Sequence, residues 1–160
     1  MSNTKKLTFS AVTAAGAVLV LLAARVIPTG EFAMAAVASL FVAAAAIDCG
    51  AVWGLAAYAV SGGLALMLAP GAPTWLYVAF FGFYPVLKQI FEGALPKVFG
   101  WAAKYLVLCI SGVVLWWFLL DLDAGKLPLY AAGAAVVFAV YDVGYSKLIA
   151  FYKSRISKKR

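Results

Sequence analysis

Ionisable side chains that fall within long apolar stretches are the residues of this sequence best placed to do chemistry. Asp142 is the clearest case, because it follows Tyr130 by 12 residues, or roughly 18 Å along a helix. Lys88, Glu92 and Lys104 stand near the adjoining ends of two apolar stretches, and Lys88 and Glu92 are one helical turn apart. A charge at the bilayer centre costs roughly 2.5 to 3.5 kcal/mol on insertion scales. We therefore expect these four residues to form an intramembrane charge network.

Two interpretations of this network remain open. The first is structural, with ion pairs that tie three helices together. The second is a coupling or docking element, with the Tyr84-Pro85 pair as a helix break beside it. Both predict the same residue types, so the sequence does not separate them.

A second polar set stands at the ends of predicted loops and would form the rim of an outward-opening ligand pocket. Its members are Arg25, Glu31, Asp121 and Asp123, with Thr29 and Lys126 beside them and Ser39 and Ser61 deeper in their helices. The simpler interpretation is that these are solvated loop groups, since an arginine at a helix end can extend its side chain toward water. The sequence thus offers a possible rim without a defined cargo.

The residue types needed for enzyme chemistry are largely missing. The chain has no histidine, and its two cysteines, Cys49 and Cys109, have neither disulfide nor metal-ligand spacing. No phosphate-binding loop or nucleophile-elbow motif is present. We therefore predict no catalytic residues, no metal site and no cofactor, and a protein that is not an enzyme.

The elements that carry these residues are predicted to be membrane-spanning helices. Of 160 residues, 66% are apolar and only 12% are charged, whereas soluble domains usually have about 25% charged residues. The apolar stretches are continuous, which favours helices over the alternating strands of a barrel. The sequence predicts an all-α, polytopic bundle of about six spans in a single membrane domain, residues 1–160. The predicted spans are Leu7–Ile27, Phe32–Ile47, Ala51–Ala69, Thr74–Ile90, Val98–Leu120 and Leu127–Phe151, the first being a retained helix and not a signal peptide.

The distribution of lysine and arginine predicts the orientation. Six spans place eleven of the 13 basic residues at one face, including Lys5, Lys6 and the basic tail 152–160, and leave Arg25 and Lys126 near the other. Basic residues are retained on the cytoplasmic side, so both termini are expected in the cytoplasm of a cell-membrane protein. The +7 net charge is then a topology signal and a contact with membrane lipid, with no nucleic acid expected. Trp75 and Tyr77 open the fourth span, where aromatic rings prefer the headgroup level.

Small residues on the first helix suggest a docking surface. Ala11 and Ala15 form an AxxxA pair, a spacing that lets another helix approach closely, although ordinary packing inside the bundle predicts the same pattern. A short chain with six apolar helices, cytoplasmic termini and this pair early in helix one resembles the substrate-binding S component of energy-coupling-factor importers. The resemblance implies a six-helix bundle that binds a vitamin-like solute and docks through Ala11 and Ala15 on a scaffold subunit, which works with an ATPase pair.

The cargo is not identified by any motif in the chain, and other functions fit the same architecture. The main alternative is a noncatalytic scaffold that resembles the MreD family of cell-shape proteins, which are also short, multi-span and without enzymatic motifs. A third is a membrane protein of another kind. A convergent outward polar pocket would favour solute binding over the other two.

Overall fold

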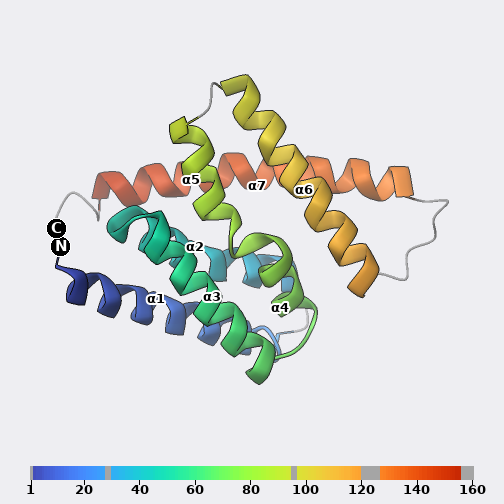
Figure 1. Cartoon of the computed structure of the whole chain (residues 1–160). Coiled ribbons are helices and arrows are strands. Elements are labelled where there is room, and N and C mark those ends of the chain that lie inside the picture. The colour runs from blue at the N-terminus through green and yellow to red at the C-terminus, as the bar shows by residue number, and fades with distance from the viewer. Residues whose placement is uncertain (1, 28–29, 95–96, 120–126, 156–160) are drawn as a thin grey trace. The chain divides into compact units, whose positions relative to one another are not determined.

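The computed structural model describes residues 2–27, 30–94, 97–119 and 127–155, and every secondary-structure element in them is a helix (Figure 1). The all-α prediction is therefore confirmed for the described residues. The chain divides into two compact units, Met1–Leu119 and Leu120–Arg160, which are described separately. The prediction of one membrane domain is not tested by this division.

Three long helices form the base of the first unit: α1 (Asn3–Ala23), α2 (Glu31–Cys49) and α3 (Ala51–Leu68). Each packs against the other two, and they lie side by side in Figure 1. Ala14, Ala45 and Ala57, one from each helix, form a buried cluster at their centre. Alanine keeps the backbones close, which is how helices pack when apolar surroundings give no hydrophobic driving force.

Two glycines set how closely these helices approach. A Cβ on Gly54 of α3 would lie 2.6 Å from the Ala46 Cβ of α2, closer than real atoms come. A Cβ on Gly16 of α1 would lie 2.6 Å from the Phe41 ring. The connection from α2 to α3 is Gly50 alone, whose φ of 102° lies in the left-handed region that glycine adopts without strain.

The fourth predicted span, Thr74–Ile90, is not one continuous helix. It consists of α4 (Ala72–Leu76), a π-helical turn over Tyr77–Phe81 labelled η1, and α5 (Tyr84–Ala94). The break falls immediately before the Tyr84-Pro85 pair, beside which the sequence offered a helix break. Proline has no N–H, and it is tolerated in a first helical turn where that donor has no intrahelical acceptor.

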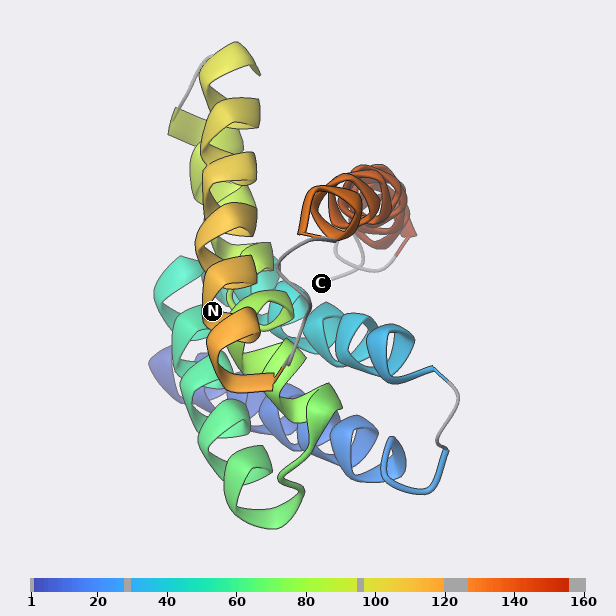
Figure 2. The same ribbon diagram turned by 90° about the vertical axis from the view of Figure 1, so that its right-hand side faces the viewer.

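The other helices follow their predicted spans closely. In the first unit α6 (Lys97–Leu119) packs against α4, η1 and α5, and Figure 2 shows it beside this broken segment. The second unit contains α7 (Leu127–Arg155). That helix includes the start of the predicted tail 152–160, whose last residues, 156–160, lie outside the described residues.

The first helix is displaced toward the N-terminus from its predicted bounds. It covers Asn3–Ala23 instead of Leu7–Ile27. Hydropathy alone defined the predicted ends, but Ile27 precedes Pro28, and the residue before a proline is disfavoured in helical geometry. The polar residues before Leu7 are compatible with a helix, so the first turn extends back to Asn3. The second helix is similarly longer than predicted, reaching Cys49.

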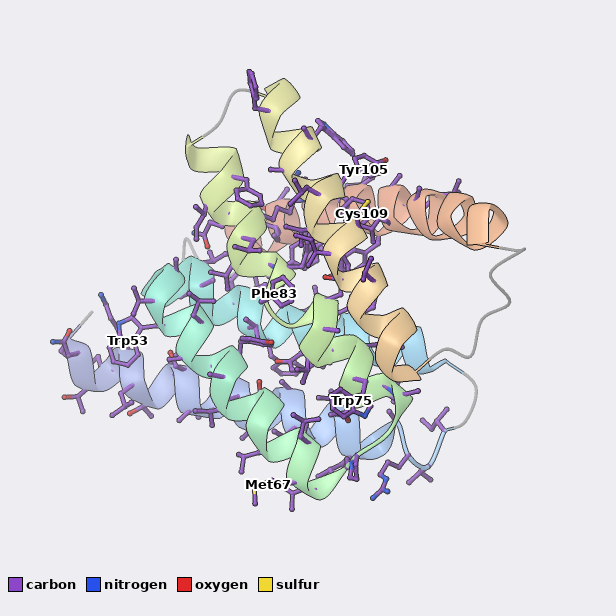
Figure 3. All side chains as sticks on the ribbon, turned by 45° about the vertical axis from the view of Figure 1, so that its right-hand side comes forward. Trp53, Met67, Trp75, Phe83, Tyr105 and Cys109 are labelled. Carbon is purple, nitrogen blue, oxygen red and sulfur yellow. The ribbon has the colours of Figure 1, made fainter. Side chains whose placement is uncertain are left out.

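Two described helices, α1 and α3, are long and apolar enough to cross a membrane by length and composition. Core helices of soluble proteins and signal sequences share those two properties, so the six-span membrane bundle stays a prediction. Much of the apolar surface of these helices is nevertheless open. On α3, Val52 and Met67 are 77% and 81% exposed, and Figure 3 shows Met67 pointing away from the other helices.

Candidate functional site

A cluster of hydroxyl groups lies where α3 meets the π turn. We call it the π-turn cluster: the side chains of Tyr58, Ser61 and Tyr77 and the backbone carbonyl of Val78. Tyr58 and Ser61 are three residues apart on α3 and therefore share a face. The Ser61 Oγ and Tyr77 Oη lie 2.7 Å apart in a hydrogen bond, and the Tyr58 hydroxyl donates to the Val78 carbonyl oxygen at 2.7 Å. Ser61 and Tyr77 are fully buried.

Gly82 makes room for this arrangement. A Cβ on Gly82 would lie 2.5 Å from the Tyr58 ring and 2.9 Å from the Tyr77 carbonyl oxygen, so only glycine lets that ring reach the π turn. A Cβ on Gly62 would sit in ordinary contact with Val78, 3.4 Å away. The Tyr58 ring also packs edge-on against Phe83, which is labelled in Figure 3, at 5.9 Å between centroids.

The hydrogen bonds of the π turn explain why Tyr58 matters to it. The Gly82 N–H donates to the Tyr77 carbonyl, five residues back, at 2.7 Å. In an α-helix that N–H would instead donate to Val78, four residues back. The Tyr58 hydroxyl thus takes the place of the backbone donor at the Val78 oxygen, in a region where an unsatisfied buried carbonyl is costly.

The residues of this cluster were mostly missed at the level of sequence. The sequence predicts Ser61 in the interior of its helix and Tyr77 at the membrane border. Both side chains are fully buried among helices, and the depth of Tyr77 in a membrane stays a prediction. Trp75, predicted for the same border, is 37% exposed. A tyrosine at position 58, in the middle of an apolar stretch, was the available signal, since a buried hydroxyl usually has a partner.

The predicted ligand rim is only partly described. The Arg25 Nη1 donates to the Leu68 carbonyl oxygen at 3.3 Å, at the end of α3 where such carbonyls have no intrahelical donor. Glu31 is the first residue of α2, and its side chain is not described. Asp121 and Asp123 lie outside the described residues. Arg25 is therefore placed beside α3, and the rim as a whole stays a prediction.

The deeper serine of the second helix and a threonine of α4 bond to backbone. The Ser39 Oγ donates to the Ala36 carbonyl of its own helix at 2.6 Å. The Thr74 Oγ1 donates to the Ala69 carbonyl at 2.6 Å, just past the end of α3. Two side chains from outside α3, Thr74 and Arg25, thus satisfy carbonyls at its C-terminal end.

The predicted charge network is divided between the units. Lys88 on α5 and Lys104 on α6 belong to the first unit, and both side chains are buried. The Lys104 Nζ lies 5.3 Å from the centroid of the Trp101 ring, a cation–π contact that offsets part of the cost of burial. The Glu92 side chain is not described. Asp142 belongs to the second unit, so its pairing with either lysine stays a prediction.

Within α7, Asp142 has a defined local setting. The Ser146 Oγ donates to the backbone carbonyl of Asp142 at 2.7 Å. The rings of Tyr141 and Tyr145 lie 5.6 Å apart. Asp142 shares a helical face with Phe138 and Tyr145, because these positions follow the i, i+4, i+7 pattern. This places the carboxylate on an otherwise aromatic face.

The alanine pair of the first helix is open in the structure. Ala11 and Ala15 are exposed, whereas Ala14, Ala17 and Leu21 of the same helix are buried. One face of α1 therefore packs against α2 and α3, and the other presents two small side chains one turn apart. The alternative that this pair serves packing inside the described bundle does not hold for these two residues.

Among the described residues, no group of three His, Cys, Asp or Glu side chains is close enough to hold a metal ion. Cys49 is buried at the end of α2, with its Sγ 3.9 Å from the Lys6 carbonyl oxygen, and Cys109 is exposed on α6 (Figure 3).

Comparisons with family models, curated proteins and solved structures give no match for this chain. The functional argument therefore depends on the residues and geometry described above.

Proposed function

We propose that this chain is a membrane-embedded subunit that docks on a partner membrane protein through the exposed face of α1, as the solute-binding subunit of an energy-coupling-factor importer does. The observation that carries the proposal is the exposure of both Ala11 and Ala15. Small side chains open to the surroundings let a partner helix come close enough for backbone contacts.

The membrane location is supported by the outward apolar side chains. Leu7, Val12 and Leu19 of α1 are more than half exposed, as are several apolar residues of α3. In water such surfaces favour aggregation, but lipid tails solvate them. Helices α1, α2, α3, the broken segment α4 to α5, α6 and α7 then correspond to six spans with cytoplasmic termini.

The proposal that this chain binds a small solute is supported by the polar groups at the outer end of α3. The Arg25 guanidinium donates to the Leu68 carbonyl at the end of α3, and the Thr74 hydroxyl donates to the Ala69 carbonyl just past it. The π-turn cluster lies further along the same helix. Of these groups Arg25 is exposed, and its guanidinium is the group that a small polar solute bound near this end would meet. The energy for import would come from a separate ATPase pair, reached through a scaffold subunit.

The docking experiment compares two double substitutions. Ala11→Leu with Ala15→Leu adds bulk to the proposed docking face while keeping the helix apolar. Ala56→Leu with Ala59→Leu adds the same bulk to exposed positions of α3 and is the matched control. The tagged wild type and the control, purified from native membranes, are expected to recover a scaffold subunit and an ATPase pair. The α1 variant should lose both at equal expression.

The other outcomes discriminate between the remaining functions. Recovery of cell-wall elongation proteins by the wild type would favour the scaffold alternative. Equal recovery of the importer subunits by both variants would remove α1 as the docking face. If the wild type recovers neither set and mass spectrometry finds no retained small molecule, the transport proposal is wrong.

A further inference from the structure

We propose that the segment from α4 to α5 has two hydrogen-bond registers, and that the Tyr58 hydroxyl selects the π register seen here. This inference is independent of the docking proposal and concerns a conformational switch within the first unit.

The two registers differ in which carbonyl accepts from Gly82. In the described register the Gly82 N–H donates to Tyr77, and the Val78 carbonyl accepts from Tyr58. In an α register the same N–H would donate to Val78. In the π register the Val78 carbonyl has no N–H donor from Gly82, and the hydrogen bond from the Tyr58 hydroxyl takes the place of that donor. The hydroxyl therefore stabilises the π register more than the α register, in which Val78 already has a backbone donor, and such a difference is the condition for shifting a two-state equilibrium.

The register decides which face of α5 is turned inward. A π turn accommodates one extra residue, so conversion to an α register rotates all that follows by about 100°. After conversion, each residue of α5 would occupy the position around the helix axis that the following residue in the sequence occupies in the π register. Leu87 would occupy the place of Lys88, and Lys88 would occupy the exposed place of Gln89.

Conversion to the α register would move the charged side chain of Lys88 from a buried to an exposed position. Lys88 is 2% exposed in the π register, and Gln89 beside it is exposed. Val86, whose Cγ2 lies 3.1 Å from where a Gly54 Cβ would stand, would leave its place against α3. Conversion would thus expose the side chain of Lys88 and remove the contact of Val86 with α3. The Tyr58 hydroxyl is well placed for this role because Gly82 lets its ring lie directly on the turn.

The test measures thiol labelling on α5. Leu87→Cys, Lys88→Cys and Gln89→Cys are made singly in a chain that also carries Cys49→Ala and Cys109→Ala, each with and without Tyr58→Phe. A water-soluble maleimide reports exposure in detergent. With Tyr58→Phe, labelling at position 88 should rise about tenfold or more, the size of shift expected when a buried carbonyl loses a donor. Labelling at position 87 should fall, and position 89 should react quickly in both backgrounds.

Two further variants separate a register change from simple loosening. Ser61→Ala removes the bond to Tyr77 and leaves the bond to Val78, so it should not alter the labelling pattern. Deletion of Ala79 removes the extra residue, which gives an α register with α5 in its present orientation. In that background Tyr58→Phe should have no effect on labelling.

Three results would overturn the proposal. Unchanged labelling at positions 87 and 88 after Tyr58→Phe would show that the π register does not depend on this hydroxyl. A rise at position 87 together with the rise at position 88 would indicate local unfolding in place of rotation. An effect of Tyr58→Phe that persists after deletion of Ala79 would show that it acts through some other contact. The Leu87→Cys series retains Lys88, so the test stands even if Lys88→Cys does not fold.

Discussion

Replacing Gly82 with alanine tests the packing of the π-turn cluster directly. The added Cβ would lie 2.5 Å from the Tyr58 ring and 2.9 Å from the Tyr77 carbonyl oxygen. The backbone φ of Gly82 is −69°, so alanine causes no backbone strain; crowding destabilises the variant, and the better helix propensity of alanine offsets up to about 1 kcal/mol of that loss.

The expected loss of stability follows from two contributions. Overpacking in a close-packed interior costs about 1 to 3 kcal/mol. If the Tyr58 ring is displaced, the Val78 carbonyl loses its hydroxyl donor, which costs about 1 to 3 kcal/mol more for a buried group. We expect Gly82→Ala to lower the free energy of unfolding by about 2 to 5 kcal/mol, since the two contributions share the same ring and are not fully additive.

The matched control is Gly63→Ala on α3, where nothing lies within 4 Å of the added Cβ. Alanine is the better helix former by about 1 kcal/mol, so this variant should be as stable as wild type or more so. Unfolding in detergent, followed by circular dichroism against denaturant, measures both. In a Tyr58→Ala background the cost of Gly82→Ala should fall, because the ring contacts are gone. If Gly82→Ala is as stable as Gly63→Ala, the close approach of Tyr58 to the π turn is refuted.

Three further predictions concern topology, the charge network and the hydroxyl pair. Because eleven of the 13 basic residues are predicted at one face, reporters fused at Gly30, Ala72 and Gly125 should be active outside the cell, and those at Gly50, Gly93 and the C-terminus should not. An external signal from the C-terminal fusion would exclude six spans. If Asp142 pairs with Lys88 or Lys104, Asp142→Asn should lower the free energy of unfolding by about 3 to 5 kcal/mol, and removing the paired lysine as well should recover part of that loss. A melting temperature in detergent equal to wild type would mean that the carboxylate is hydrated or unpaired. Ser61→Ala and Tyr77→Phe should each cost about 0.5 to 1.5 kcal/mol, and the double variant should cost less than their sum, because both remove the same 2.7 Å bond; full additivity in denaturant unfolding would contradict that bond.

The helical class and most helix positions in the described residues follow from local sequence patterns. Continuous apolar stretches separated by proline, glycine and charge predicted α2, α3, α6 and α7 to within a few residues at most ends. Glycine at position 50 and proline at position 28 mark boundaries because their backbones restrict or permit particular geometries locally. Such signals need no information about neighbouring helices.

Which face of each helix is buried was beyond the sequence. Apolar residues surround most of these helices on all sides, so there is little periodicity to separate inside from outside. The exposure of Ala11 and Ala15, and the full burial of Tyr77, became evident only once the helices were packed. The same holds for Arg25, whose acceptor at Leu68 is 43 residues away.

The break in the fourth segment shows most clearly what tertiary structure decided. A π turn and an α turn differ here in the acceptors of backbone N–H groups such as that of Gly82, and the local sequence Tyr77–Phe81 fits either. The choice depends on the Tyr58 hydroxyl, which arrives from another helix 20 residues away, and on a glycine that leaves room for its ring. Hydropathy and turn propensities describe a segment alone, whereas this register is fixed by a hydrogen bond that exists only after α3 has packed against it.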